Sequence, residues 1–212
     1  IITAINEKRL DIAYYLLMEL NRIPDNYFYG ADITKIVLPS TIRSIGFRSF
    51  GHCKSLKWIS LSSSLKKISE ESFFNCKSLK KITIPSSVIK IENKAFNFCS
   101  SLSQIIFTIP SSVTSIGHEA FDNCSSLHQI IIPPNVTSEF SSLFSWCSSL
   151  TKVIILAPIT TIKSFNFKRC SSLKEITIPS TIHTIESFAF SDCKQIKKIV
   201  IFSCDKKHIK YL

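Results

Sequence analysis

The sequence has little glycine, and this scarcity excludes one group of ligand-binding folds. Four of its 212 residues are glycine, whereas soluble proteins usually contain about 7%. Phosphate-binding loops depend on glycine, and Gly30, Gly46, Gly51 and Gly117 fit neither the G-x-G-x-x-G nor the G-x-x-x-x-G-K-[ST] pattern. Nucleotide-binding folds that use such loops are therefore not expected.

Long apolar runs and dense charge are also missing. No apolar run approaches the ~20 residues of a membrane-spanning helix, so no membrane span is expected in this chain. Charged residues make up 19% of the sequence, yet 26 Lys and Arg outnumber 15 Asp and Glu, which gives a net charge of +11. Hydrophobic residues account for 45%, which argues against a disordered chain.

The eight cysteines lack the close pairs that are typical of zinc sites and redox motifs. Most of them lie 23 residues apart, with one spacing of 25 and a last spacing of 11. A fixed period indicates a repeat architecture, in which each cysteine occupies the same position of a recurring unit. The cysteines are Cys53, Cys76, Cys99, Cys124, Cys147, Cys170, Cys193 and Cys204.

The repeated unit reads L-x-x-I-x-I-P-S-[ST]-[VI]-x-x-I-x-x-x-[AS]-F-x-x-C-x-S, and seven copies end in a cysteine. A phenylalanine always stands three residues before that cysteine. These residues are Phe50, Phe73, Phe96, Phe121, Phe144, Phe167 and Phe190. One unit cannot bury its own Leu, Ile and Phe side chains, whereas stacked units can bury them in one continuous core.

The unit predicts two extended segments and a turn. The alternating L-x-x-I-x-I segment is typical of a strand with one buried face, and the proline that follows it ends the strand. The [VI]-x-x-I segment predicts a second short strand, and [AS]-F-x-x-C closes the coil. Parallel strands stack at about 4.8 Å, so we expect a repeat solenoid with coils of about 23 residues.

These motifs resemble the BspA-like (Treponema-type) leucine-rich repeat, whose consensus has the same order of L-x-x-I-x-[IL]-P, I-x-x-x-A-F and C-x-x-L. The resemblance covers about residues 23–202. It implies a curved solenoid with a parallel β-sheet on the concave face and a non-enzymatic binding role, often as a surface antigen or adhesin. Glu139, Leu156 and Leu65 depart from the unit, so we expect irregular coils at these positions.

The two ends of the chain differ from the repeats. Residues 1–22 have apolar residues at helical spacing until Pro24 and Asp25, which predicts an N-terminal helix. Such a helix would cap the open end of the solenoid. Alternatively it ends a preceding helical region, because residues 4–17 are similar to the second half of an ankyrin repeat. Residues 203–212 are expected to form a C-terminal tail or a partial repeat.

No arrangement of residues indicates an enzyme, a cofactor or a metal site. The five histidines fall at different positions of the unit, and acidic residues are scattered, so no acid–base pair stands out. The seven periodic cysteines are expected to form a buried column without disulfides, because stacked Cβ atoms about 4.8 Å apart exceed the usual disulfide spacing. Cys204 and His208 are off the period, and two ligands do not make a zinc site.

The outward-facing strand positions carry the predicted partner-binding residues. In L-x-x-I-x-I, the third and fifth positions point away from the core. Three consecutive units have isoleucine at the fifth position and Gln or Lys at the third, which predicts an apolar patch with a polar rim. The alternative is β-propensity alone, since isoleucine suits any strand. The predicted contact residues are Ile106, Ile131, Ile154, Gln104, Gln129 and Lys152, with Trp58 as a separate anchor.

Lysines recur at fixed positions and suggest a second kind of partner. Lys57, Lys80, Lys174 and Lys197 follow the first leucine position of their units, and Lys81, Lys152 and Lys198 stand at the next position. Stacking predicts columns of positive charge, which would attract an acidic protein or an acidic glycan. Nucleic acid is not expected, because most aromatic residues are core phenylalanines and leave no platform for bases. The alternative is that these lysines only solubilise the surface.

Three functional interpretations follow. The first is a protein–protein interaction module that binds through the concave sheet, and the family resemblance suggests a cell-surface adhesin. The second is a structural scaffold or spacer packed inside a larger intracellular assembly. The third is polyanion binding through the lysine columns. The sequence alone does not assign a compartment or name the partner.

Overall fold

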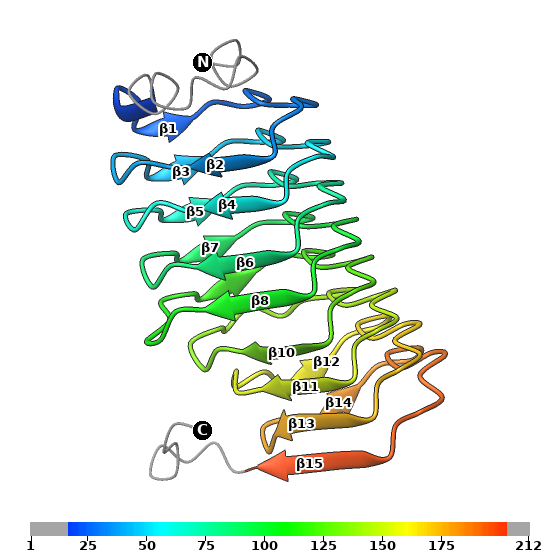
Figure 1. Ribbon diagram of the computed structural model, residues 1–212. Coiled ribbons are helices and arrows are strands. Elements are labelled where there is room, and N and C mark those ends of the chain that lie inside the picture. The colour runs from blue at the N-terminus through cyan, green and yellow to red at the C-terminus, as the bar shows by residue number, and fades with distance from the viewer. Residues whose placement is uncertain (1–16, 203–212) are drawn as a thin grey trace.

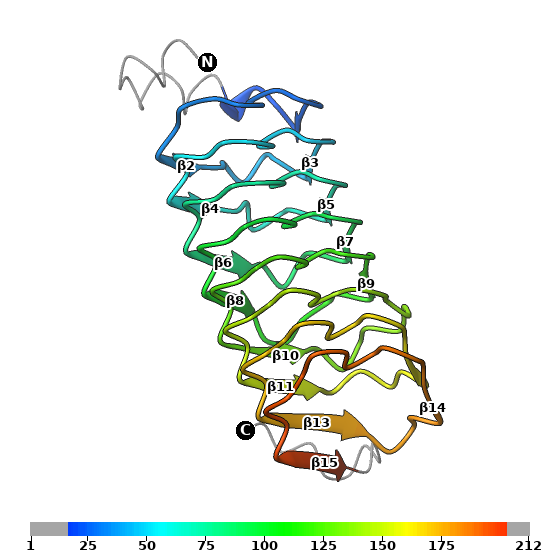
Figure 2. The same ribbon diagram turned by 90° about the vertical axis from the view of Figure 1, so that its right-hand side faces the viewer.

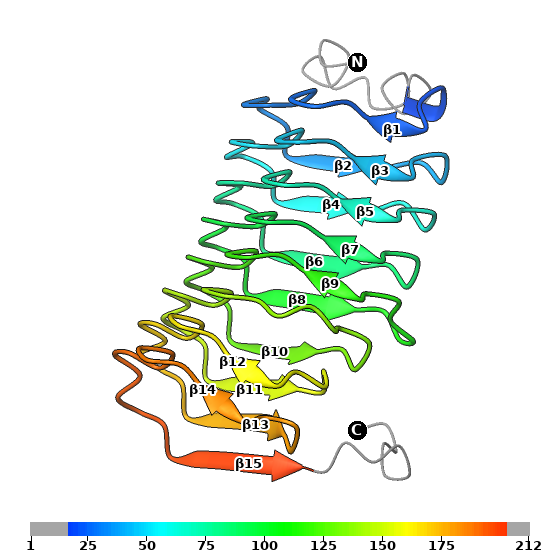
Figure 3. The same ribbon diagram turned by 180° about the vertical axis from the view of Figure 1, so that it is seen from behind.

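The protein folds as a stack of coils with parallel strands, in agreement with the predicted solenoid (Figure 1). The computed structural model describes residues 17–202. Each coil contributes a longer strand on one side and, in most coils, a two-residue strand on the opposite side (Figures 1 and 3). Among the described residues, no helix has the length and apolar character needed to cross a membrane.

The longer strands form the surface that we call the sheet face. They are β2 (Lys35–Val37), β4 (Trp58–Ser60), β6 (Lys81–Ile84), β8 (Gln104–Phe107), β10 (Gln129–Ile132), β11 (Lys152–Ile155), β13 (Glu175–Pro179) and β15 (Lys198–Phe202). β6 to β15 pair in one parallel six-stranded sheet, and β2 pairs with β4. Lys152 pairs with Glu175, which pairs with Lys198, so equivalent positions of successive units lie side by side.

The short strands line the opposite side (Figure 3). They are β1 (Arg22–Ile23), β3 (Ser44–Ile45), β5 (Lys67–Ile68), β7 (Lys90–Ile91), β9 (Ser115–Ile116), β12 (Thr161–Ile162) and β14 (Thr184–Ile185). β1 to β9 form one five-stranded sheet, and β12 pairs with β14. The described part of the chain has no short strand in the coil between β9 and β12.

The missing strand confirms the irregular fifth coil that Glu139 predicts. Glu139 stands where the unit has isoleucine, and it is exposed. Phe140, the next residue, is buried instead. The hydroxyl of Ser138 accepts a hydrogen bond from the Ile116 N–H (3.0 Å) and contacts the Ile116 carbonyl (3.3 Å). A side chain therefore replaces the backbone ladder in this coil.

The predicted ends lie largely outside the described residues. The helix expected over residues 1–22 falls mostly on residues 1–16, and the tail expected over 203–212 lies entirely beyond residue 202. Within the described part, Leu17 and Met18 are helical, and strand β1 already begins at Arg22. The off-period Cys204 and His208 also lie outside this part.

One column of phenylalanine rings runs through the core. The rings of Phe28, Phe50, Phe73, Phe96, Phe121, Phe144, Phe167 and Phe190 stack face to face, with neighbouring centroids 5.0–5.9 Å apart. Seven of the eight are fully buried, and Phe190 in the last coil is partly buried. Stacked and offset rings contribute beyond the area that they bury, so this column links each coil to the next.

The cysteine column is bonded to the phenylalanine column. The thiol of Cys99 donates to the carbonyl oxygen of Phe73 in the preceding coil (3.1 Å). The same carbonyl also accepts the N–H of Cys76 in its own coil (3.2 Å). All seven periodic cysteines make this inter-coil thiol contact, at 2.8–3.3 Å. A small apolar side chain with one weak donor fits this position, which explains the recurrence of cysteine.

The turns around each Phe–Cys segment, which we call the corner, depend on left-handed residues. Seven successive coils place the residue two before the core phenylalanine and the residue two after it at φ of 49–63°. In the second cysteine-ended coil, for example, Phe73 and Asn75 donate N–H groups to Ala95 and Asn97 of the next coil, both at 2.8 Å. Left-handed conformations cost about 1–2 kcal/mol for residues other than glycine. The inter-coil hydrogen bonds offset that cost.

We expect Phe121→Ala to lower the free energy of unfolding by about 3–5 kcal/mol, because it leaves a cavity in the ring column. Urea unfolding followed by circular dichroism measures this change. Phe98→Ala is the matched control, since Phe98 is 44% exposed on the corner of the neighbouring coil, and its effect should stay near 0.5 kcal/mol. A loss below about 1 kcal/mol for Phe121→Ala would reject the core assignment.

Candidate interaction surface

The structure brings the three predicted isoleucines onto adjacent strands of the sheet face. Ile106 lies on β8, Ile131 on β10 and Ile154 on β11. Ile131 pairs directly with Ile154 across the parallel ladder. Ile131 is 49% exposed, whereas Ile106 and Ile154 are half-buried. One exposed isoleucine therefore lies between two half-buried ones on adjacent strands.

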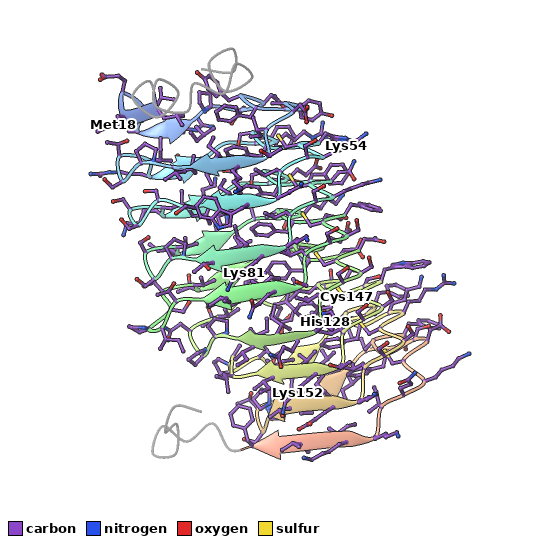
Figure 4. All side chains as sticks on the ribbon, in the orientation of Figure 1. Met18, Lys54, Lys81, His128, Cys147 and Lys152 are labelled. Carbon is purple, nitrogen blue, oxygen red and sulfur yellow. The ribbon has the colours of Figure 1, made fainter. Side chains whose placement is uncertain are left out.

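A polar row borders these isoleucines, as the sequence predicts. Gln104, Gln129 and Lys152 occupy successive positions of one ladder. The ammonium of Lys152 lies 3.5 Å from a carboxylate oxygen of Glu175. The same oxygen lies 3.5 Å from the ammonium of Lys198, so one carboxylate serves two lysines. Figure 4 shows Lys152 and Lys81 over the strands of the sheet face.

Trp58 lies on the same face but apart from the isoleucines. Its side chain is 45% exposed on β4, where it pairs with Lys35 of β2. Strand β6 separates β4 from β8, and the ladder is interrupted between β4 and β6. Trp58 is therefore a separate exposed aromatic residue, as predicted, and it does not extend the isoleucine patch.

The lysine columns are shorter than the prediction suggests. Lys57 and Lys80 lie on neighbouring coils, and Lys174 and Lys197 lie on another neighbouring pair, whose backbones are joined by a 2.9 Å hydrogen bond. Ser103, His128 and Thr151 occupy the same position in the three intervening coils. The lysines at this position are thus divided into two separate pairs. Stacking aligns equivalent positions of successive coils, but the residue type at such a position varies from coil to coil.

Exposed aromatic side chains on the corner are the residues that the sequence interpretation missed. Core phenylalanines occur at every corner, as expected, but five further aromatic residues there are exposed. Tyr29, Phe98, Trp146, Phe165 and Phe188 are 39–65% exposed. Trp146, for instance, lies two residues after the core Phe144. Aromatic residues two positions from the core phenylalanine could have indicated these exposed side chains. They were missed because the inside–outside alternation of a strand does not apply in a turn.

The cysteines have the environment of structural residues. Six of the seven thiols in the described part are fully buried. Burial raises the pKa of the Cys53 and Cys99 thiols to about 12. A thiol rather than a thiolate therefore prevails near neutral pH, which disfavours nucleophilic chemistry and metal binding. Among residues 17–202, no three His, Cys, Asp or Glu side chains come together as metal ligands.

One acidic residue of the corner, Asp122, has an environment that disfavours its ionised form. Burial raises the pKa of Asp122 to about 6, and the nearby carboxylate of Glu119 adds to this effect. One carboxylate oxygen accepts the side-chain amide of Asn123 (3.1 Å) and contacts that of Asn97 (3.5 Å). The other oxygen is buried without a hydrogen-bond partner, as is the amide oxygen of Asn97. The ionised form of Asp122 is therefore poorly solvated.

A family comparison agrees with the geometry. The model of the BspA type leucine rich repeat region matches residues 21–108 and 106–211, with six copies. The ankyrin-like resemblance at the N-terminus is not borne out. No curated protein sequence matches the chain significantly.

Solved structures share the fold. A leucine-rich repeat protein from Bacteroides ovatus is 26% identical, with a TM-score of 0.62 over 87% of this chain and 59% of its own, which is less than two thirds of that protein. The leucine-rich repeat protein of T. pallidum is 23% identical, with a TM-score of 0.58 over 84% of this chain and 72% of its own. A third, from Eubacterium ventriosum, is 21% identical with a TM-score of 0.55, over 86% of this chain and 70% of its own.

The raised thiol pKa values predict that the buried cysteines are inert in the folded protein. At pH 8 we expect Cys53 and Cys99 to remain unmodified by iodoacetamide in native buffer and to react fully in urea, because reaction requires an accessible thiolate. Peptide mass spectrometry measures modification at each site. Rapid native labelling of either residue would contradict its burial.

We expect Asp122→Asn to stabilise the protein at neutral pH. A carboxylic acid whose pKa is raised on folding contributes stability below its unfolded pKa, and that stability is lost as the pH rises through the folded pKa. The wild type should therefore lose stability between about pH 4 and pH 6 relative to the variant. At pH 7.5 the variant should be more stable by about 1–2 kcal/mol, after allowance for partial exposure of the carboxylate.

Urea titrations at pH 4.5 and pH 7.5 test this difference. Glu119→Gln is the companion variant, since Glu119 raises the pKa of Asp122 through charge repulsion, and it should give a smaller gain of the same sign. Equal stability of wild type and Asp122→Asn at both pH values would show that Asp122 is well solvated in solution.

Proposed function

Because the chain belongs to the BspA-type leucine-rich repeat family, we propose that it is a non-enzymatic module that binds a protein partner through its sheet face. Members of this family are repeat proteins that typically serve as interaction or surface proteins, and this supports protein binding as the general activity. The finer assignment concerns the surface, the contact residues and the partner. It is argued from the residues of the sheet face.

The exposed position of Ile131 carries this proposal. At the equivalent position, two strands of the six-stranded sheet have threonine, Thr83 on β6 and Thr177 on β13. Threonine satisfies β-propensity and remains polar, so propensity does not require isoleucine here. Three consecutive isoleucines at the centre of the sheet, bordered by glutamine and lysine, have the composition of a contact surface with an apolar centre and a polar rim.

Continuity of the sheet adds to the argument. β10 and β11 pair over four residues, from Gln129 with Lys152 to Ile132 with Ile155. The backbone groups of this region are committed to the ladder, so side chains alone are available to a partner. A rigid surface loses little conformational entropy when it binds.

The alternatives are less well supported. Polyanion binding requires extended positive charge, whereas the lysines divide into two pairs and Glu175 neutralises part of the row formed by Lys152 and Lys198. A scaffold packed in a larger assembly requires contacts on several sides of the solenoid. A surface adhesin and an intracellular scaffold both use protein contacts, so the sheet-face proposal is compatible with either setting.

We expect Ile131→Asp to weaken partner binding by at least about tenfold while leaving the fold intact, because a charge at the centre of an apolar contact remains unpaired and desolvated. Affinity purification with cross-linking mass spectrometry identifies the partner and the cross-linked face. Isothermal titration calorimetry with that partner then compares wild type and variant.

Val37→Asp is the matched control. Val37 has the equivalent strand position on β2 and is 45% exposed, but it lies outside the isoleucine patch. It should bind like the wild type. Unchanged affinity of a folded Ile131→Asp variant would refute the sheet-face proposal, and steep loss of affinity with salt would favour polyanion binding.

A further inference from the structure

The corner of the last described coils exposes a second group of large side chains. Trp146, Phe165 and Phe188 are 43%, 39% and 65% exposed. All three lie at left-handed positions, with φ of 61–62°. They lie two residues before or after a core phenylalanine, whereas the isoleucine patch lies on strands β8, β10 and β11. Figure 2 shows the longer strands of the sheet face along one side of the stack and the short strands along the other.

Folding does not explain aromatic residues at these positions. The left-handed positions two residues before or after the core phenylalanine hold polar residues in most other coils, among them Asn26, Asn75 and Asn123, with φ of 56–61°. Asparagine is several-fold enriched in left-handed conformations, whereas a bulky residue there is an outlier. An exposed ring also contributes little to the core. The turns would form more readily with asparagine, so another constraint accounts for Trp and Phe.

Two cations lie over these rings. The guanidinium carbon of Arg169 is 4.1 Å from the centroid of Trp146, and the ammonium of Lys168 is 5.0 Å from that of Phe165. Phe188 stacks on Phe165, with centroids 5.8 Å apart and planes 12° apart. Each of these pairs covers one ring face with a neighbour from the chain itself. The corner therefore presents exposed aromatic rings together with N–H donor groups.

The charge of the group is only partly balanced. Arg169 Nε lies 3.4 Å from a carboxylate oxygen of Asp192. Within residues 17–202, Lys168 makes no ion pair with a carboxylate. Cation–π contacts hold both side chains in place, and their remaining donors have no hydrogen-bond partner among the described residues. These donors suit carboxylate oxygens of a partner.

We infer that Trp146, Phe165, Phe188, Lys168 and Arg169 form a second binding surface, the corner patch, for a polypeptide segment in which carboxylate and large apolar side chains are adjacent. Aromatic residues and arginine are enriched in protein interfaces, and Trp and Arg dominate their hot spots. The cations and the ring that already lie over one face of each aromatic residue compete with a stacked base, which disfavours nucleic acid. The corner patch is independent of the sheet-face proposal, because it uses different residues on a different side.

The two tryptophans of the chain allow the two surfaces to be observed separately. The sequence contains two Trp residues, Trp58 on the sheet face and Trp146 in the corner patch. Fluorine NMR of protein labelled with fluorinated tryptophan gives one resonance for each. Trp58→Phe and Trp146→Phe assign the two signals.

The probes are short synthetic peptides in which Glu flanks Leu and Phe, matched peptides with Lys in place of Glu, and a single-stranded oligonucleotide. We expect the Glu peptides to shift the Trp146 resonance in a saturable manner, with little change at Trp58. The Lys peptides should bind at least about tenfold more weakly. No shift with the Glu peptides, equal shifts with the Lys peptides, or a Trp146 shift with the oligonucleotide alone would each overturn the inference.

Two sets of variants separate binding from folding. The double variant Lys168→Gln/Arg169→Gln keeps Trp146 as the reporter and should weaken binding of the Glu peptides by about tenfold or more. Phe165→Asn/Phe188→Asn should also weaken it, while leaving the urea midpoint unchanged or higher because asparagine tolerates the left-handed backbone. Phe98→Asn, at an equivalent corner position with φ of 60°, is the control and should bind like the wild type. Wild-type affinity in both double variants would refute the corner patch.

Discussion

Hydrogen bonding between successive corners is the constraint on which the rest of the structure depends. Left-handed residues on either side of each core phenylalanine turn alternate N–H groups along the solenoid axis, as Phe73 and Asn75 show when they donate to the next coil. This geometry requires the same number of residues between successive corners, except where extra residues form a loop. The 23-residue period, the ring column and the thiol contacts all follow from that fixed register.

The same register divides the surface into sides with different chemistry. On the sheet face, regular pairing commits the backbone and leaves side chains such as Ile131 to meet a partner. On the corner, the left-handed backbone projects alternate side chains outward, so Trp146 and Phe165 are exposed although the intervening Phe144 and Phe167 are buried. A repeat protein of this kind offers separate surfaces because each position of the unit forms its own column, and each column can vary without disturbing the core.

Much of the fold could be predicted from the sequence because burial repeats with the unit. Ile68, Phe73 and Cys76 are fully buried, as their positions in the unit predict, and the substitution at Glu139 marked the coil that loses its short strand. The candidate patch was only partly predictable. Alternation identified the outward positions, but the exposed fraction depends on neighbouring strands, which leave Ile131 open and Ile106 half-buried. The corner aromatics were missed because a turn with alternating left-handed residues has no simple hydrophobic pattern.

The sequence by itself determined the solenoid, its period, its core columns and the order of outward residues on the strands, because these depend on local spacing and on the need to bury apolar side chains between identical units. Tertiary structure decided which outward residues form a surface. It placed Arg169 over Trp146 from the following coil, gave the Phe73 carbonyl a thiol donor from Cys99, and buried the Asp122 carboxylate beside Asn97. These contacts join residues one coil apart, and their geometry depends on how the coils stack.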